Sequence, residues 1–267
     1  SITSPSTRNG VTGLRPTYGR VSRHGVMSLS WSMDKVGPLG RNAEDCAIVF
    51  EAIQGKDKND LSTTDLPFGV DWKKDIKNLR VAYLKKDIEK DTTETGDNLR
   101  NALKSLKEMG IEPAAVEMPK EVPYRGFDII LRAEAGAFFD ELVRSGDVDL
   151  MVEQSRRSRA NSLRQSRFIP AVEYIQANRQ RQVLIQKMHD LMKDFDVLIS
   201  PTFGNDQLMA TNLTGHPVIA VPTGLDDENH PTSMTFVGNL YDEESILLLA
   251  KAFQDNTSFD ELHPPGY

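Results

Sequence analysis

Residues 79–84, with the sequence LRVAYL, begin the stretch that decides the fold class. They form a short, largely apolar run of the kind that predicts a strand. Residues 94–109, ETGDNLRNALKSLKEM, follow with apolar side chains at helical spacing and end before Gly110. Residues 111–118, IEPAAVEM, resemble a second strand, in which Pro113 favours a position at the edge of the sheet. This strand–helix–strand order predicts an α/β layer.

Further elements are predicted on both sides of this unit. Apolar runs predict strands at 197–201, 217–222 and 233–237. Helical spacing predicts helices at 42–55, 127–143, 170–195 and 243–253. Residues 1–40 are rich in glycine and proline, with apolar residues between them, and predict a packed but irregular segment.

The distribution of these elements also bears on domain organisation. Strands occur towards both ends of the chain, and no internal repeat or shift in composition marks a boundary. We therefore expect residues 1–267 to form a single domain whose sheet combines segments that are distant in the sequence.

The bulk composition excludes some classes of function. The net charge of −7 argues against a general nucleic-acid binder, because neutralising phosphates requires a basic surface. No apolar run reaches the length of a membrane-spanning helix, and no membrane partner is expected. Cys46 is the one cysteine and lies in an apolar run, so we expect a buried thiol and favour a reducing, cytoplasmic location.

The amino-terminal segment carries the most informative motif. Ser1-Ile2-Thr3-Ser4-Pro5-Ser6 precedes a Gly-x-x-Gly-[Leu/Phe]-[Lys/Arg]-Pro-[Ser/Thr] pattern, met by Gly10, Gly13, Leu14, Arg15, Pro16 and Thr17. Further blocks follow in order at 19–25, 32–38, 195–202 and 212–224. Together they resemble the amidase signature family of serine–serine–lysine amidases, which is related to the A component of glutamyl-tRNA(Gln) amidotransferase. Residues 70–190 carry no diagnostic motif.

The resemblance implies both a fold and a chemistry. The implied fold is an α/β domain with a mixed, twisted sheet covered by helices, incomplete in this chain. The implied reaction is attack of a serine on an amide carbon to give an acyl-enzyme. Ser1 matches the nucleophile, whereas the second serine, the lysine and the oxyanion-hole glycines of the family lie upstream of this motif. We therefore expect the isolated chain to be inactive, and to pair with the missing amino-terminal portion or associate with other copies of itself.

The residues after Ser1 are candidates for substrate binding. Ile2 and Thr3 hold the positions that follow the nucleophile. Thr3 replaces the arginine usual at this position, which in some relatives contacts a substrate carboxylate, and threonine offers no positive charge. This departure argues against a substrate with a free carboxylate beside the amide, and against a glutamine-handling role. The sequence leaves the small-molecule amide substrate otherwise open.

Four alternative interpretations remain. Ser1 could be an amino-terminal nucleophile with its own α-amine as base, although Ser4-Pro5-Ser6 favours a loop rather than the strand that this chemistry needs. An anionic partner such as RNA could dock on the arginines between Arg156 and Arg167, with Arg179 and Arg181 further on, or these arginines could form a solvated helical face. The protein could also be a non-catalytic binding or assembly subunit, or an amidotransferase subunit that releases ammonia from an amide donor.

No cofactor or metal is expected. The five histidines lack the spacing of metal ligands relative to one another or to Cys46. The phosphate-binding Gly-Lys-[Ser/Thr] motif, the dinucleotide-binding Gly-x-Gly-x-x-Gly motif and the Gly-x-Ser-x-Gly elbow are all missing from the sequence.

Overall fold

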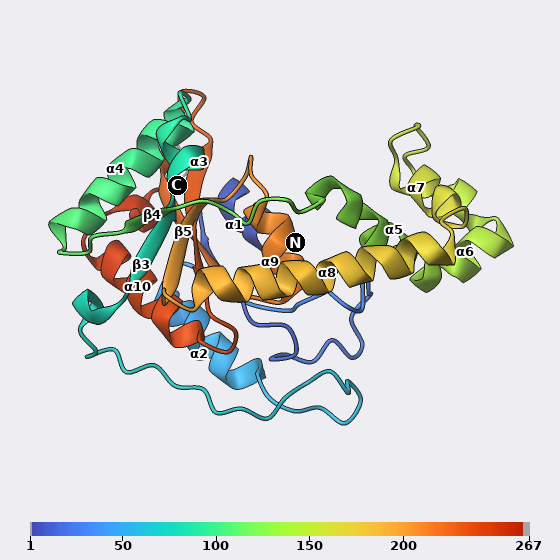
Figure 1. Ribbon diagram of the computed structural model, residues 1–267, viewed down its shortest axis with the longest axis horizontal. Helices are drawn as coiled ribbons and strands as arrows, with labels where there is room; N and C mark the ends of the chain where they lie inside the picture. The colour runs from blue at the N-terminus through green and yellow to red at the C-terminus, as the bar shows by residue number, and fades with distance from the viewer. Residues whose placement is uncertain (1, 264–267) are drawn as a thin grey trace.

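The computed structural model describes residues 2–263 and is built around one seven-stranded sheet (Figure 1). The strand order is β2-β1-β6-β7-β5-β3-β4. The strands are β1 (Thr12–Arg15), β2 (Leu39–Gly40), β3 (Val81–Leu84), β4 (Ala114–Val116), β5 (Val197–Pro201), β6 (Val218–Leu225) and β7 (Pro231–Gly238).

The sheet is mixed, as predicted. β3 runs parallel to β4 and β5, whereas β1, β2, β6 and β7 join it through antiparallel pairs. β1 pairs with β6 in the register Leu14–Ile219, so segments about two hundred residues apart in the sequence form neighbouring strands. β4 lies at one edge, where a proline such as Pro113 costs no ladder hydrogen bond.

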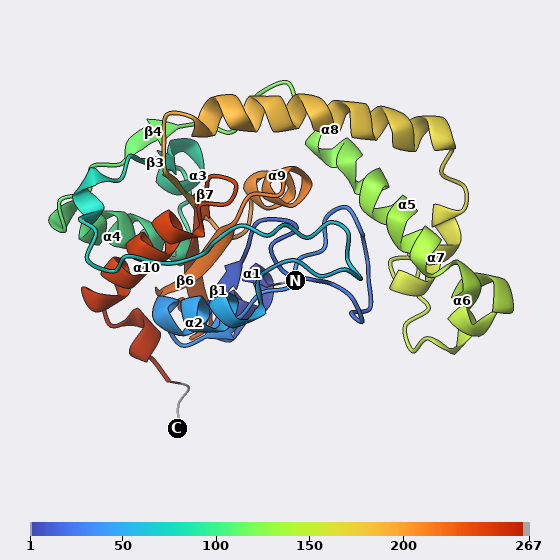
Figure 2. The same cartoon turned by 90° about the horizontal axis from the view of Figure 1, so that it is seen from below.

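Helices cover both faces of the sheet (Figures 1 and 2). Strand alternation sends Val81, Val197 and Phe236 to one face and Ala82, Leu198 and Val237 to the other, where they join two separate buried clusters. The first face packs against α2 (Ala43–Ile53), α4 (Glu94–Glu108) and α10 (Glu243–Asp255). The second packs against α8 (Ala171–Met192) and α9 (Gln207–Thr214).

A helical arm extends away from the sheet along α8 (Figure 1). It contains η2 (Tyr124–Phe127), α5 (Asp128–Phe138), α6 (Asp140–Ser145), η3 (Asp147–Leu150) and α7 (Arg159–Ser166). The shorter remaining elements are α1 (Thr3–Arg8), α3 (Lys85–Glu89), η1 (Ile76–Asn78) and η4 (Phe259–Glu261). Of the helices within residues 2–263, none is both long and apolar enough to cross a membrane.

Two predictions of local structure are wrong. The single helix predicted at 127–143 is interrupted at Phe139, whose φ of −96° and ψ of 23° leave helical geometry, and α6 starts at the next residue. Residues 1–40 are less irregular than predicted, because they contain α1, β1 and the two-residue β2. The helix at α1 has no apolar periodicity, and its hydroxyl side chains bond to carbonyls one turn earlier.

Candidate functional site

A cavity of about 640 Å³ lies against the amino-terminal motif. Ile2 forms part of its wall, while Ser1 lies outside the described residues. The loop at 23–36 supplies much of the rest, together with Arg15 at the end of β1 and residues at the start of α5 and along α9. A ligand in this cavity would therefore contact the residue that follows Ser1.

The backbone at Ile2 is held by the first turn of α1. The Ile2 carbonyl accepts hydrogen bonds from the Ser6 backbone N–H at 3.0 Å and from its hydroxyl at 2.8 Å. α1 packs so closely on β1 that a Cβ at Gly13 would lie 1.9 Å from Ser6 Oγ. A glycine is thus required at this point of the motif so that α1 can lie on the sheet.

A chain of buried hydroxyls also fixes α1 to the sheet. Thr7 Oγ1 lies 2.6 Å from Ser233 Oγ on β7, and Ser233 Oγ lies 2.7 Å from Thr202 Oγ1, in the residue that follows β5. Thr202 Oγ1 in turn lies 2.8 Å from Thr235 Oγ1. Each hydroxyl can donate one bond and accept another, so the chain satisfies its own buried polar groups.

Thr3, the second predicted substrate contact, lies in a different environment from Ile2. Its side chain is buried, its carbonyl accepts from Thr7 Oγ1 at 2.9 Å, and it is not among the described residues that line the cavity. The structure thus brings Ile2 to the cavity and directs Thr3 into the packing of α1. Substrate binding by either residue stays a prediction.

Two carboxylates, the half-buried Asp34 and the buried Glu134, shape the loop that walls the cavity. Asp34 accepts hydrogen bonds from the Ser28 hydroxyl and from the backbone N–H groups of Leu29 and Ser30, at 2.7–2.9 Å. Glu134 on α5 is fully buried and accepts from Ser30, Ser32 and Tyr174. These bonds hold the loop against the base of the helical arm.

Arg181 on α8 holds the same loop from another direction. Its guanidinium donates to Ser32 Oγ and Ser32 O, both at 2.8 Å, and to Leu213 O at 2.6 Å. Burial lowers the pKa of Arg181, although the nearby Glu134 opposes this effect. We interpret Arg181 as a clamp between α8, α9 and the loop.

Two cations, Arg15 and Lys35, form the polar wall of the cavity. Arg15 Nη1 donates to Asn212 Oδ1 at 3.1 Å, and Lys35 Nζ donates to Asn212 O at 3.3 Å and to Met33 O at 2.8 Å. Burial lowers the pKa of Arg15 to about 10. Burial, and then the charges of Arg15 and Arg181, hold the pKa of Lys35 well below its usual value.

Sequence reasoning did not identify this convergence. Arg15 and Lys35 both belong to matched motif blocks, but Asn212 lies 177 residues beyond Lys35. The repeated matches could have indicated that the blocks meet in space, whereas the side chains that meet depend on the register of β1 against β6.

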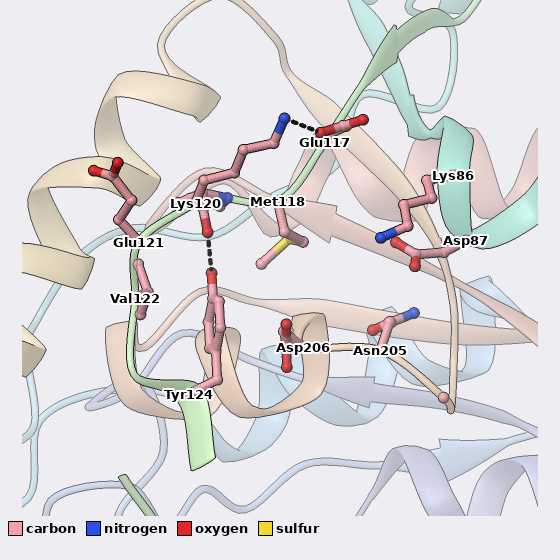
Figure 3. A pocket seen from close by; sticks show the side chains of 12 residues that line it. Lys86, Asp87, Glu117, Met118, Lys120, Glu121, Val122, Tyr124, Asn205 and Asp206 are labelled. Atoms are coloured by element: carbon pink, nitrogen blue, oxygen red, sulfur yellow. Dashed lines mark hydrogen bonds and ion pairs between the residues drawn. The ribbon is translucent and has the colours of Figure 1, made fainter. Parts of the chain in front are cut away.

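A second cavity, of about 620 Å³, opens beyond the carboxyl ends of β3, β4 and β5 (Figure 3). Glu117 and Lys120 pair at 2.6 Å on its rim, and Tyr124 donates to Pro119 O at 3.1 Å. Burial, together with Asp206 and Glu117, raises the pKa of Asp87. This cavity mixes both signs of charge and lies apart from the amino-terminal motif, so we do not assign the amide chemistry to it.

The other candidates from the sequence are the arginine run, Cys46 and the possible metal ligands. In the arginine run, Arg164 pairs with Asp149 and Arg167 pairs with Asp140, as expected for a solvated, ion-paired face. Cys46 is buried as predicted, which raises the pKa of its thiol to about 12. Within the described part of the chain, histidine, cysteine and carboxylate side chains form no group of three or more that could hold a metal ion.

Comparison with known proteins supplies a family assignment. A family model described as Amidase matches residues 1–211. The A component of glutamyl-tRNA(Gln) amidotransferase from Syntrophomonas wolfei is 30% identical over 315 residues, a match that covers 100% of this chain and 63% of that protein. The chain thus spans less than two thirds of the length of this relative.

Two solved structures share the fold. An amidase family protein from Bacillus anthracis superposes with a TM-score of 0.81 at 21% identity, covering 100% of this chain and 57% of its own. The native peptide amidase from Stenotrophomonas maltophilia superposes with a TM-score of 0.79 at 23% identity, covering 100% of this chain and 62% of its own.

Proposed function

This chain belongs to the amidase family, and from that premise we propose that its protein cleaves a carboxylic amide with Ser1 as the nucleophile. The position of Ile2 carries the proposal. Ile2 follows Ser1 in the sequence and lies in the wall of a cavity large enough for an organic amide.

The proposed reaction is acyl transfer in two steps. Ser1 Oγ attacks the amide carbon, the C–N bond breaks, and the serine proton passes through a base to the leaving amine. Water then attacks the acyl ester, which releases the carboxylic acid and restores the hydroxyl. The base that the family resemblance implies is a second serine backed by a lysine, and neither matches a position of this chain.

Lys35 and His216 are the groups of the isolated chain that we considered as a base for Ser1. Lys35 is the cavity lysine with a depressed pKa, but its ammonium is bound to the carbonyls of Met33 and Asn212. His216 is bound to Thr214 Oγ1 at 2.7 Å, and burial lowers its pKa to about 4. Neither fits a free base for Ser1, so we expect no hydrolysis by residues 1–267 alone.

The test measures amide hydrolysis by the product of the whole gene. We expect a panel of aryl, alkyl and peptide amides to include at least one substrate, and Ser1→Ala to abolish its cleavage. Ser4→Ala is the matched control, because Ser4 follows Ser1 by three positions in the sequence, lies on α1 and is not among the described cavity residues. Cleavage that persists in Ser1→Ala contradicts the proposal.

A second candidate is an amidotransferase component that releases ammonia from an amide donor. The 30% identity to the A component of a glutamyl-tRNA(Gln) amidotransferase supports it, while Thr3 in place of the usual arginine argues against glutamine as the donor. Ammonia release from glutamine by the whole-gene product, lost in Ser1→Ala, would favour this candidate. Release from simple amides alone would favour the hydrolase.

A further inference from the structure

The polar wall of the cavity beside Ile2 contains an unusual arrangement of charge. Arg15 on β1 and Lys35 on the neighbouring loop both donate hydrogen bonds to Asn212 of α9, one to its side chain and one to its carbonyl. Arg15 donates its other terminal nitrogen to the hydroxyl of Thr211. Two cations therefore meet at neutral oxygen acceptors only.

Neither cation has an ion-pair partner among residues 2–263. No carboxylate of that range lies within 4.0 Å of Arg15 or Lys35. Arg15 Nε is buried and has no hydrogen-bond acceptor in the described part of the chain. Lys35 uses two of its three N–H groups on main-chain carbonyls.

The carboxylates of the cavity are already engaged elsewhere. Asp34 accepts three hydrogen bonds from neutral donors of its own loop. Asp60 pairs with Arg23 at 3.0 Å, and Asp128 pairs with Arg132. Asp34 keeps its negative charge and acts on Lys35 without an ion-pair contact, while the charges of Arg15, Arg23 and Arg181 oppose it. No carboxylate of the described walls forms an ion pair with Arg15 or Lys35.

Burying a cation without a counter-charge costs free energy. This cost lowers the pKa of both Arg15 and Lys35. Arg15 stays charged at neutral pH with a pKa of about 10, while the ammonium of Lys35 is easier to deprotonate than in water. The charged or titratable groups that act on or face Lys35 are Arg15, Tyr18, Arg23, Asp34, Arg181 and His216. A bound anion would favour the charged form of Lys35.

The rest of the cavity favours an apolar ligand body. Its other walls include Leu29, Trp31 and Met33 from the loop, and Leu208 and Leu213 from α9. The cavity thus combines these apolar walls with the charged groups described above, which is the arrangement expected for an amphiphilic small molecule.

We propose that Arg15 and Lys35 form a subsite for a carboxylate, and that this cavity binds an organic acid with an apolar body. If the proposed amidase function also holds, its substrate is an amide that carries a carboxylate group. The positive charge that Thr3 lacks is then supplied by Arg15 and Lys35 from β1 and the following loop.

The first test compares three probes by titration calorimetry on residues 1–267. Phenylbutanoate combines a carboxylate with an apolar body, phenylbutanamide removes the charge, and acetate removes the body. We expect the acid to bind at least about tenfold more tightly than either control, because only the acid offers both a charge to Arg15 and Lys35 and an apolar body to the other walls. Equal affinity for the acid and the amide would overturn the proposal.

The position of the ligand can be read from fluorescence. The chain has two tryptophans, of which Trp31 lines the cavity and Trp72 packs elsewhere on the core. In a Trp72→Phe variant, phenylbutanoate should change the emission of Trp31 with the affinity found by calorimetry. Binding without any change in Trp31 emission would place the acid outside this cavity and contradict the proposal.

Variants then test the assigned cation. Lys35→Gln should remove the preference for the acid over the amide, and Lys35→Arg should keep it. Lys187→Gln is the matched control, because Lys187 also donates to a main-chain carbonyl, that of Lys120, at 2.6 Å, but lies outside the cavity. A preference that survives in a folded Lys35→Gln variant contradicts the assignment.

A pH titration of the unaltered chain does not depend on how the variants fold. As pH rises through the lowered pKa of Lys35, the ammonium becomes neutral, so affinity for the acid should fall while affinity for the amide stays constant. A constant ratio of the two affinities would contradict the proposal. None of these measurements needs turnover, so the carboxylate subsite and the amidase function can fail independently.

Discussion

Replacing Glu243 tests how the Arg-Pro-Thr part of the motif is anchored. Glu243 lies in the first turn of α10, and its Oε1 accepts the Thr17 backbone N–H at 2.9 Å. Its Oε2 lies 3.7 Å from Arg20 Nε, and both side chains are at most 1% exposed. A Glu243→Gln substitution keeps the shape but leaves the Arg20 cation buried without its counter-charge.

The size of the effect follows from this geometry. Breaking a buried ion pair by neutralising one partner costs about 3–5 kcal/mol. The 3.7 Å separation is too long for a hydrogen bond, so we expect the low end, about 3 kcal/mol. For a chain of this size the melting temperature falls by about 2–4 °C per kcal/mol, which predicts a decrease of about 6–12 °C.

The neighbouring residue provides a matched control. Glu244 lies in the same first turn and pairs with Lys74 at 3.1 Å, but both partners are partly exposed. Glu244→Gln should cost at most about 1 kcal/mol, because water screens the pair. Both variants are compared with the unaltered chain by calorimetry and urea unfolding. Equal losses for Glu243→Gln and Glu244→Gln would refute the argument from burial.

Three further predictions concern packing and ionisation. Gly13→Ala should destabilise the chain by about 1–3 kcal/mol in urea unfolding, because its Cβ would overlap Ser6 Oγ; Gly69→Ala, with open space around it, should be neutral within about 0.5 kcal/mol. Burial lowers the pKa of His216 to about 4 from 6.5, so its neutral form contributes fully above pH 6.5 and loses its contribution as pH falls towards 4. Over that window the unaltered chain should lose about 3 kcal/mol more stability than His216→Gln, and parallel pH profiles would refute this. Because burial raises the pKa of Cys46 to about 12, its thiol should react with a disulfide reagent only as fast as the chain opens, and rapid reaction of the native chain would contradict this.

Much of the sheet could be predicted from the sequence because its strands are continuous apolar runs. The stretches around Val81, Val197 and Val218 are buried on both faces of the sheet, so their composition alone marks them as strands. α4 and α10 were equally clear, since apolar side chains recur at helical spacing and Gly110 follows α4.

Polar helices were harder to predict. α1 buries Thr3, Ser6 and Thr7, whose hydroxyls would ordinarily favour turns, and its position depends on Gly13 of the neighbouring strand. α9 buries Gln207, Thr211 and Thr214 in a similar way. In both helices tertiary packing decides the structure, and no periodic apolar pattern in the sequence predicts the helix.

Part of the candidate site could be predicted from the sequence, and part could not. A linear motif predicts Ser1 as nucleophile, and adjacency in the chain predicts that Ile2 lies near the substrate. The meeting of Arg15 and Lys35 at Asn212 depends on long-range strand register, and no local pattern of residues encodes it.

Covalent labelling by a serine-directed fluorophosphonate identifies the nucleophilic serine directly. The whole-gene product would be labelled, digested and sequenced by mass spectrometry, with residues 1–267 treated in parallel. We predict one stoichiometric adduct, on Ser1 of the whole-gene product, and no labelling of the isolated chain above background. An adduct on another serine, or labelling that persists in Ser1→Ala, would contradict the account of Ser1 as the nucleophile.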